Sequence, residues 1–279
     1  MNSFGGDWTQ EKIEILVDYA KAYLVIMNSY WKLMYFDGFA GTGLIVKEKK
    51  ENTKITIGAA LRILGLDDPI SFDSYYFVEY EEAKCNKLAA LTKEQFPQKE
   101  IHTITEDCNK KLKDMAVFLR TPSGKNHKIL AYIDPCGMQL EWSSLACLKD
   151  LPIDMWILIP TGMGVNRLLK KNGNISDAWM SKLEQFLGIS SEEVVTHFYG
   201  KSRQMSLFGD EPIKVKEQNA VEKSATLYQE RLKTIFNFVS NLYILKNSTN
   251  SVMFHYVMVS NNKTAVKIAN EIIKKYNNK

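Results

Sequence analysis

The chain has 279 residues, of which 45% are hydrophobic and 24% charged, values typical of a globular protein rather than a disordered or fibrous one. Its net charge of +4 is too small to indicate a polyanion partner by itself. The cysteines form no CxxC pair and do not cluster with the four histidines, which argues against a disulfide framework or a closed zinc site. Met1 is not followed by a signal pattern, and no apolar run is long enough to cross a bilayer, so we expect a cytoplasmic protein without a membrane partner.

The first half of the chain predicts helices that alternate with strands. Apolar residues recur at helical spacing from Ile13 to Met27, and Thr9 is suited to cap that helix. Strands are expected at 32–37, 75–79, 101–105, 128–133 and 155–159, and helices at 57–65, 80–95, 107–119 and 143–148. This alternation favours a Rossmann-like α/β fold with a doubly wound, mostly parallel sheet.

The second half interrupts that alternation. An amphipathic helix at 179–187 and a polar loop at 200–217 predict a helical and flexible insertion over 166–225, acting as a lid or a partner-binding segment. A helix at 220–240, strands at 242–245 and 252–259 and a last helix then return to the core. We therefore expect a core of residues 1–165 and 226–279. The charged stretch Lys47–Lys54 is expected to be a solvated loop.

A glycine-rich turn follows the first expected strand and reads Asp37-Gly38-Phe39-Ala40-Gly41-Thr42-Gly43. Glycine allows a ligand to approach the backbone where a Cβ atom would block it. In open α/β sheets, ligands bind at the carboxyl ends of the strands, so the location suits a binding site. The spacing is not that of a dinucleotide fingerprint, and the lysine of a phosphate-binding loop is missing, which argues against nucleoside triphosphate hydrolysis.

Acidic residues end the following strands as well. Glu79 is placed to accept hydrogen bonds from ribose hydroxyls, Asp107 to accept one from an adenine amino group, and Asp134 follows the next strand. One acid at such a position is commonly a helix cap. Four in succession, counting Asp37, predict a nucleoside site.

The glycine-rich turn resembles motif I of class I S-adenosylmethionine-dependent methyltransferases, and Asp134-Pro135-Cys136-Gly137 lies where their motif IV would lie. More narrowly, Trp8-Thr9 with Lys12, the FAGTG turn, and the Tyr132–Gly137 segment followed by Trp142 resemble the three-Cys-motif partner protein (TcmP) family. The resemblance implies S-adenosylmethionine as cofactor and the product of a neighbouring three-Cys-motif gene as partner. It implies that the following residues would bind the cofactor: Asp37, Phe39, Ala40, Gly41 and Gly43 at its methionine end, Glu79 at the ribose and Asp107 at the adenine.

The same resemblance implies that Asp134, Pro135 and Cys136 face the substrate, and it favours transfer of a methyl group to an amino group of DNA or RNA. In amino-directed enzymes an aromatic residue of motif IV stacks on the base, whereas this chain has Cys136 and Gly137 there. The departure favours an alternative, a partner or adaptor protein that keeps the fold without catalysis. A third reading makes Cys136 a nucleophile, although a cysteine that ends a strand more often serves packing.

A separate motif lies in the expected insertion. Residues 204–208 resemble the peptide with which bacterial proteins dock on the replicative sliding clamp, with Gln204, Leu207 and Phe208 as its anchors. Two adjacent apolar side chains and one amide are enough to fill a preformed pocket. The alternative is that Leu207 and Phe208 hold the loop against the core.

Overall fold

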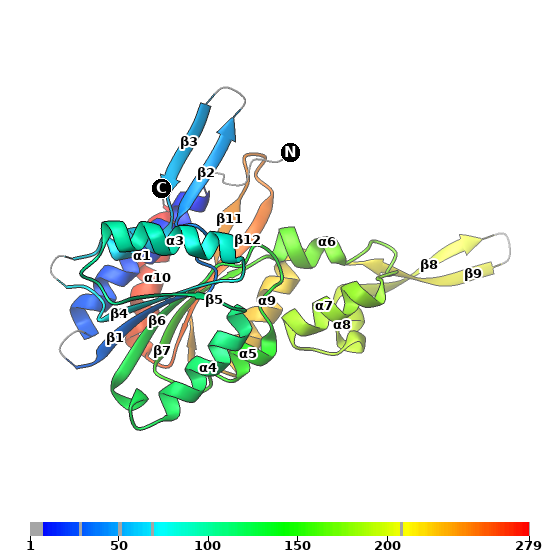
Figure 1. Cartoon of the computed structure of the whole chain (residues 1–279). Helices are drawn as coiled ribbons and strands as arrows, with labels where there is room; N and C mark the ends of the chain where they lie inside the picture. Colours follow the sequence, from blue (N-terminus) through cyan, green and yellow to red (C-terminus); the bar gives the residue numbers. More distant parts are fainter. Residues whose placement is uncertain (1–7, 28–29, 50–51, 68–69, 207–208, 279) are drawn as a thin grey trace.

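A computed structural model describes residues 8–27, 30–49, 52–67, 70–206 and 209–278. Its centre is an eight-stranded sheet in the order β10-β12-β7-β6-β1-β4-β5, with β11 also paired to β12 (Figure 1). The strands are β1 (Lys32–Asp37), β4 (Ser74–Glu79), β5 (Ile101–Thr105), β6 (His127–Ile133), β7 (Ile153–Ile159), β10 (Phe238–Val239), β11 (Tyr243–Lys246) and β12 (Val252–Ser260).

The pairing directions identify the fold class. Strands β5, β4, β1, β6 and β7 are parallel, and β12 runs antiparallel between β7 and β10. This is the strand order of the class I methyltransferase fold, so the predicted Rossmann-like, mostly parallel sheet is confirmed. Because crossovers return each parallel strand in the same direction, the carboxyl ends of four neighbouring strands meet at one edge.

Both faces of the sheet are covered by helices. Leu33 and Tyr35 of β1 belong to one apolar cluster, and Met34 and Phe36 belong to the other, as the two-residue period of a strand requires. All seven residues of β7 are buried, which accounts for the apolar run that follows Asp154 in its sequence. The first face is covered by α1 (Trp8–Met27), α2 (Ala59–Leu64), α3 (Glu82–Gln95) and α10 (Lys263–Asn277), and the second by α4 (Cys108–Arg120), α5 (Trp142–Ala146) and α9 (Ala220–Leu232).

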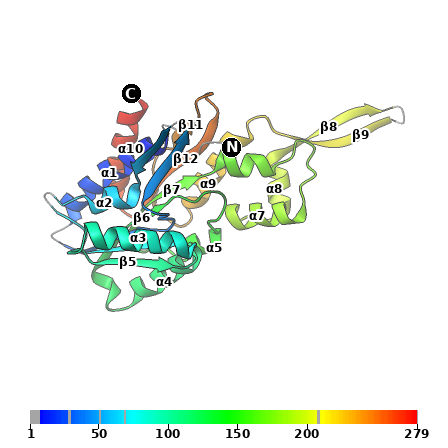
Figure 2. The same ribbon diagram turned by 45° about the horizontal axis from the view of Figure 1, so that its top comes forward.

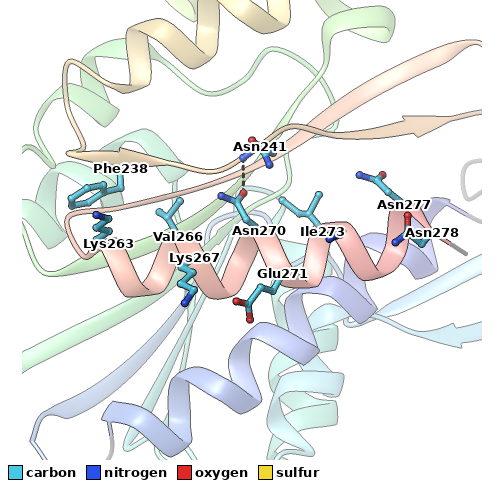
Figure 3. Close-up of a pocket in the computed structure, with 11 residues that line it drawn as sticks. Phe238, Asn241, Lys263, Val266, Lys267, Asn270, Glu271, Ile273, Asn277 and Asn278 are labelled. Atoms are coloured by element: carbon cyan, nitrogen blue, oxygen red, sulfur yellow. Dashed lines mark hydrogen bonds between the residues drawn. The ribbon is translucent and has the colours of Figure 1, made fainter.

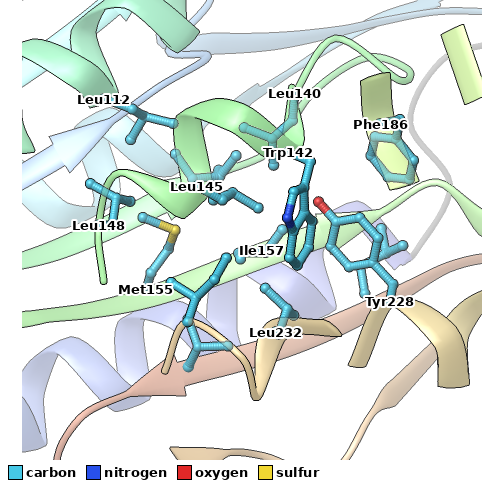
Figure 4. Packing of buried hydrophobic residues seen from close by; sticks show 14 of the residues in the cluster. Leu112, Leu140, Trp142, Leu145, Leu148, Met155, Ile157, Phe186, Tyr228 and Leu232 are labelled. Atoms are coloured by element: carbon cyan, nitrogen blue, oxygen red, sulfur yellow. The ribbon is translucent and has the colours of Figure 1, made fainter. Parts of the chain in front are cut away.

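The helices of residues 166–198 lie beside α9, and the chain after them projects outward as a hairpin (Figures 1 and 2). Residues 166–219 follow a π-helical turn (Thr161–Val165) and form α6 (Asn166–Leu168), α7 (Asp177–Leu187), α8 (Ser191–Phe198) and a hairpin of β8 (Tyr199–Ser206) and β9 (Gly209–Lys216). Phe186 of α7 stacks on Tyr228 of α9 with ring centroids 4.8 Å apart, and Tyr228 meets the edge of Trp142 at 5.5 Å (Figure 4). These contacts join the segment to the apolar core of the second face.

Three local expectations from the sequence are wrong. Residues 47–49 and 52–54 of the expected loop belong to a hairpin of β2 (Leu44–Lys49) and β3 (Asn52–Ile57), because β-branched residues at 45–46 and 55–57 flank the charged ones. Residues 200–206 and 209–216 form the strands of the β8–β9 hairpin, which points away from the sheet, instead of a loop. The helix expected over 220–240 ends at Leu232, and residues 238–239 form β10.

The described part of the proposed clamp-docking motif, residues 204–206, ends β8. Gln204 lies in β8, opposite Glu211 in the antiparallel register. Leu207 and Phe208 lie outside the described residues, so docking on a sliding clamp stays a prediction. The division into a core and an insertion over 166–225 likewise stays a prediction. No helix in the described ranges is long and apolar enough to cross a membrane.

Candidate functional site

The turn after β1 is held between the two neighbouring strands. The Gly38 amide donates to the carbonyl of Tyr132 in β6 at 3.0 Å, and the Ala40 amide donates to the carbonyl of Val78 in β4 at 3.0 Å. Gly41 has a φ of +61°, in the left-handed region that favours glycine, and no atom lies within 4 Å of the place where its Cβ would stand. The turn therefore presents bare backbone to open space.

The carboxylates of Glu79 and Asp107 accept hydrogen bonds from different parts of the backbone. The Glu79 carboxylate accepts from the Gly41 amide at 3.0 Å and from the Glu81 amide at 2.9 Å, so it shapes the glycine-rich turn directly. Asp107 caps α4, because its Oδ1 accepts from the amides of Asn109 and Lys110 at 2.8 and 3.2 Å. Asp107 is therefore a helix cap, as a single acid at such a position commonly is. Its Oδ2 is still able to contact a ligand.

Two adjoining cavities lie at this edge of the sheet, with volumes of about 780 and 180 Å³. The larger one has the size of a small-molecule site. The ten residues predicted to bind the cofactor or face the substrate all line one cavity or the other: Asp37, Phe39, Ala40, Gly41, Gly43, Glu79, Asp107, Asp134, Pro135 and Cys136. The structure thus brings these residues together, while Gln204 lies in the distant β8–β9 hairpin.

Another hollow, of about 670 Å³, runs along α10 and holds none of these residues (Figure 3). Lys263, Lys267 and Asn270 line it, and the Asn241 amide donates to the side-chain oxygen of Asn270 at 2.7 Å across it. It is more open than the cavities at the strand ends, and no predicted residue faces it.

Asp37 is buried, with 1% of its surface exposed. Burial raises the pKa of this carboxyl to about 8, and the nearby Asp134 adds to the rise, whereas a hydrogen bond from the Phe39 amide at 3.1 Å and the charge of Lys12 oppose it. A cationic group bound beside Asp37 would favour the ionised form.

An ion pair between α1 and the residue that follows β6 was not foreseen from the sequence. The Lys12 ammonium lies 2.5 Å from Oδ2 of Asp134, which also accepts from the Tyr132 hydroxyl at 2.9 Å. Lys12 stands 5.0 Å from the ring centroid of Trp8, and Trp8 packs on Phe254 of β12 at 4.9 Å. Lys12 was noted at the head of the first helix, but no sequence signal linked it to Asp134. Tyr132 could have been found, because it lies two residues before Asp134 on one strand.

Cys136 is exposed at the cavity wall, so the expectation that it serves packing is wrong. Partial desolvation and then the charge of Asp134 raise the pKa of its thiol, which disfavours the thiolate that a nucleophile requires. Pro135 beside it is buried. A Cβ atom on Gly137 would meet nothing within 4 Å, so the place where an aromatic residue would stand is open.

No protein-family model and no curated protein matches the chain. Among solved structures it is similar to the putative methyltransferase yhhF from Escherichia coli, with 11% identity over 77% of this chain and 89% of that one and a TM-score of 0.35. It is similar to Trm1 from Pyrococcus horikoshii in complex with S-adenosyl-L-methionine, with 11% identity, coverage of 97% and 72% and a TM-score of 0.40. It is also similar to an S-adenosylmethionine-dependent methyltransferase from Clostridium acetobutylicum, with 10% identity, coverage of 88% and 92% and a TM-score of 0.35. Likeness at this level carries no argument about substrate or chemistry, and the fold assignment rests on the strand order.

Proposed function

We propose that this protein binds S-adenosylmethionine at the carboxyl edge of its sheet and transfers a methyl group to an amino group of a nucleic acid. The observation that carries the proposal is the meeting of the glycine-rich turn with Asp37, Glu79, Asp107 and Asp134 around two joined cavities. A helix cap explains one of these acids, but caps alone do not explain why all four line the same space.

The residues present suit this cofactor. The open backbone at Gly41 and the buried carboxyl of Asp37 would hold its methionine end, together with Phe39, Ala40 and Gly43. Glu79 uses each carboxylate oxygen for one backbone amide, which leaves a lone pair on each for the ribose hydroxyls. The uncommitted oxygen of Asp107 would accept from the adenine amino group.

S-adenosylmethionine supplies an electrophilic methyl group, and the acceptor must supply a nitrogen lone pair. Asp134 lines both cavities, so its carboxylate would accept a hydrogen bond from the acceptor amino group and leave the nitrogen lone pair free to attack. The backbone carbonyl of Pro135 would accept the second amino hydrogen. After transfer the nitrogen carries one proton too many, and Asp134 would take it and pass it to water.

Gly137 favours a second candidate function, a partner or adaptor protein that keeps the fold without catalysis. The open space beside Gly137 removes the stacking surface that a flipped base would use. Membership of the TcmP family is part of this proposal, with the product of a neighbouring three-Cys-motif gene as the partner.

Calorimetry with S-adenosylmethionine and S-adenosylhomocysteine tests the cofactor. We expect the wild-type protein to bind both, and Glu79→Gln to bind about tenfold or more weakly, because a hydrogen bond to a charged group contributes about 1.5–3 kcal/mol. Glu94→Gln, an exposed change on α3, is the matched control and should bind as the wild type does. Failure of the wild-type protein to bind either compound would contradict the proposal.

A transfer assay with labelled S-adenosylmethionine then tests the acceptor. DNA, tRNA, rRNA and the neighbouring gene's product serve as acceptors in parallel. Label in a nucleic acid, recovered as an N-methylated base, is the expected result. Label in protein alone would contradict the proposed acceptor, whereas cofactor binding without transfer to any acceptor would support the adaptor.

A further inference from the structure

The first observation is the burial of the Lys12 ammonium. Lys12 and Lys128 are buried, with 5% and 7% of their surface exposed, and the side chain of Lys99, which pairs with Asp67, is as little exposed as that of Lys12. Lys12 comes from α1, and its ammonium lies between the ring of Trp8 and the carboxylate of Asp134. A buried ammonium is costly unless it is paired, so this placement fixes Lys12 and Asp134 against each other.

The second observation is that the two carboxylate oxygens of Asp134 differ in their hydrogen bonds. Oδ2 accepts from both the Lys12 ammonium and the Tyr132 hydroxyl, at 2.5 and 2.9 Å. Oδ1 forms no hydrogen bond with any residue in the described part of the chain, and the Asp134 side chain is 21% exposed, on the cavity. Two donors on one oxygen hold the plane of the carboxylate, so the other oxygen has a defined position in open space.

The third observation is the excess of acid around the cavity. Glu79, Glu81, Glu106, Asp107 and Asp134 line the larger cavity, and Asp37 lines the smaller one. The described lining contributes two cations in return, Lys12 and Lys84, and Lys84 is engaged by Glu81 at 2.6 Å. Because Lys84 is engaged by Glu81, Lys12 is the lining cation that is paired with Asp134.

We propose, on the basis of the function proposed above, that Lys12 is a positioning residue that pairs with Asp134 and holds its Oδ1 toward the acceptor amino group. Lys12 acts through Asp134 and need not touch the acceptor. Lys12 lines both cavities, so it would position Asp134 at the point where the methyl donor and the acceptor would meet. The methyl group moves from sulfur to nitrogen, and Lys12 neither gains nor loses a proton in that step.

Cys136 offers a readout that requires neither cofactor nor acceptor. The charge of Lys12 lowers the pKa of the Cys136 thiol and the charge of Asp134 raises it, so the rate of alkylation reports on the ion pair. In a Cys147→Ser background Cys136 is the exposed thiol, because Cys85 and Cys108 are buried. Alkylation by iodoacetamide is followed as a function of pH.

The variants are Lys12→Met, which keeps the length of the side chain, and Lys12→Arg, which keeps the charge. Lys12→Met should slow alkylation of Cys136 about threefold at about pH 8, because loss of the cation lowers the fraction of thiolate, and Lys12→Arg should restore most of the rate. Lys21→Met, an exposed change on the same helix, is the matched control and should leave the profile unchanged. Thermal unfolding of each variant confirms that it is folded.

The same variants are then assayed with labelled S-adenosylmethionine and random-sequence single-stranded DNA and RNA. For Lys12→Met we expect a fall in kcat of about 10²-fold, the size of one acid–base contribution, with the Kd for S-adenosylmethionine changed less than about threefold. An unchanged thiol profile, or an equal loss in Kd and kcat, would overturn the role of Lys12. If the wild-type protein does not bind S-adenosylmethionine, the proposed function fails, and the thiol profiles still decide whether the Lys12 ammonium lies beside Asp134 and Cys136.

Discussion

Two lysine–aspartate pairs lie at opposite ends of the same sheet. Lys12 and Asp134 meet at the carboxyl edge, 2.5 Å apart, beside a cavity of about 780 Å³. Lys128 and Asp154 lie near the amino ends of β6 and β7, 4.0 Å apart, and Asp154 is 1% exposed. Both pairs consist of a lysine and an aspartate. Only their surroundings differ, and we use that difference to distinguish a structural ion pair from a candidate functional one.

The difference is clearest in the carboxylate oxygens. Both oxygens of Asp154 are occupied, because Oδ2 accepts from the Tyr19 hydroxyl at 2.8 Å and Oδ1 from the Ser260 hydroxyl at 2.6 Å. Asp134 has two donors on one oxygen and leaves the other facing the cavity. A buried acid whose oxygens are all satisfied stabilises one conformation, whereas an acid with a free oxygen at a cavity can bind something else.

The largest effect that we expect concerns Asp37, the buried acid of the carboxyl edge. Its pKa is raised to about 8 in the folded protein from 3.8, so the native state binds its proton more tightly than the unfolded state between about pH 4 and pH 8. The free energy of unfolding should therefore fall as the pH rises through this window. Asp37→Asn should remove the fall and stabilise the protein above pH 8 by up to about 6 kcal/mol, at about 1.4 kcal/mol for each pKa unit.

Urea unfolding of the wild type and Asp37→Asn at a series of pH values measures this effect. Asp114→Asn, on the exposed side of α4, is the control and should leave the pH dependence unchanged. A wild-type free energy of unfolding that is flat across the window would contradict the assigned burial of Asp37.

The next effect concerns the pair at the amino ends. Asp154→Ala leaves Lys128 buried without its counter-ion and removes the acceptor of Tyr19 and Ser260, so it should lower the free energy of unfolding by about 3–5 kcal/mol. Asp134→Ala should cost less, because Asp134 is one-fifth exposed and water in the cavity can solvate the Lys12 ammonium. Urea unfolding at neutral pH compares the two; equal losses would remove the distinction between the pairs.

The third effect is on activity, and here we expect the larger loss at Asp134 and not at Asp154. Asp134→Asn keeps the size of the side chain but loses the charge, and methyl transfer should fall about 10²-fold or more if Asp134 acts on the acceptor amino group. Asp154→Asn should leave the transfer rate of the folded protein unchanged, because Asp154 lies outside both cavities. Transfer rates are compared at a temperature where both variants are folded by circular dichroism. Retention of activity in Asp134→Asn would refute the role proposed for this acid.

The carboxyl edge could be predicted from the sequence because its signals are local. A buried strand, a glycine-rich turn and an acid at each strand end are short patterns, and the parallel sheet brings them together without further information. The pairing of Lys12 with Asp134 joins residues 122 positions apart, and no local pattern indicates which lysine will meet which acid. The β2–β3 hairpin could not be predicted, because the charged residues between the apolar parts of its two strands are typical of a solvated loop.

The smallest effect uses two helix caps, one at each end of the sheet. Asp107 caps α4 beside the cavity, and Asn262 caps α10 beside Asp154, its Oδ1 accepting from the Thr264 amide at 2.9 Å. Changing either residue to Ala should lower the free energy of unfolding by about 1 kcal/mol, the usual contribution of an N-cap. Asp107→Ala should also weaken binding of S-adenosylmethionine several-fold, because Asp107 faces the cavity, while Asn262→Ala should leave binding unchanged. Calorimetry and urea unfolding on both variants separate these outcomes: if Asp107→Ala loses stability but not affinity, Asp107 is a cap and nothing more, and the adenine would have to be held by other residues of the cavity.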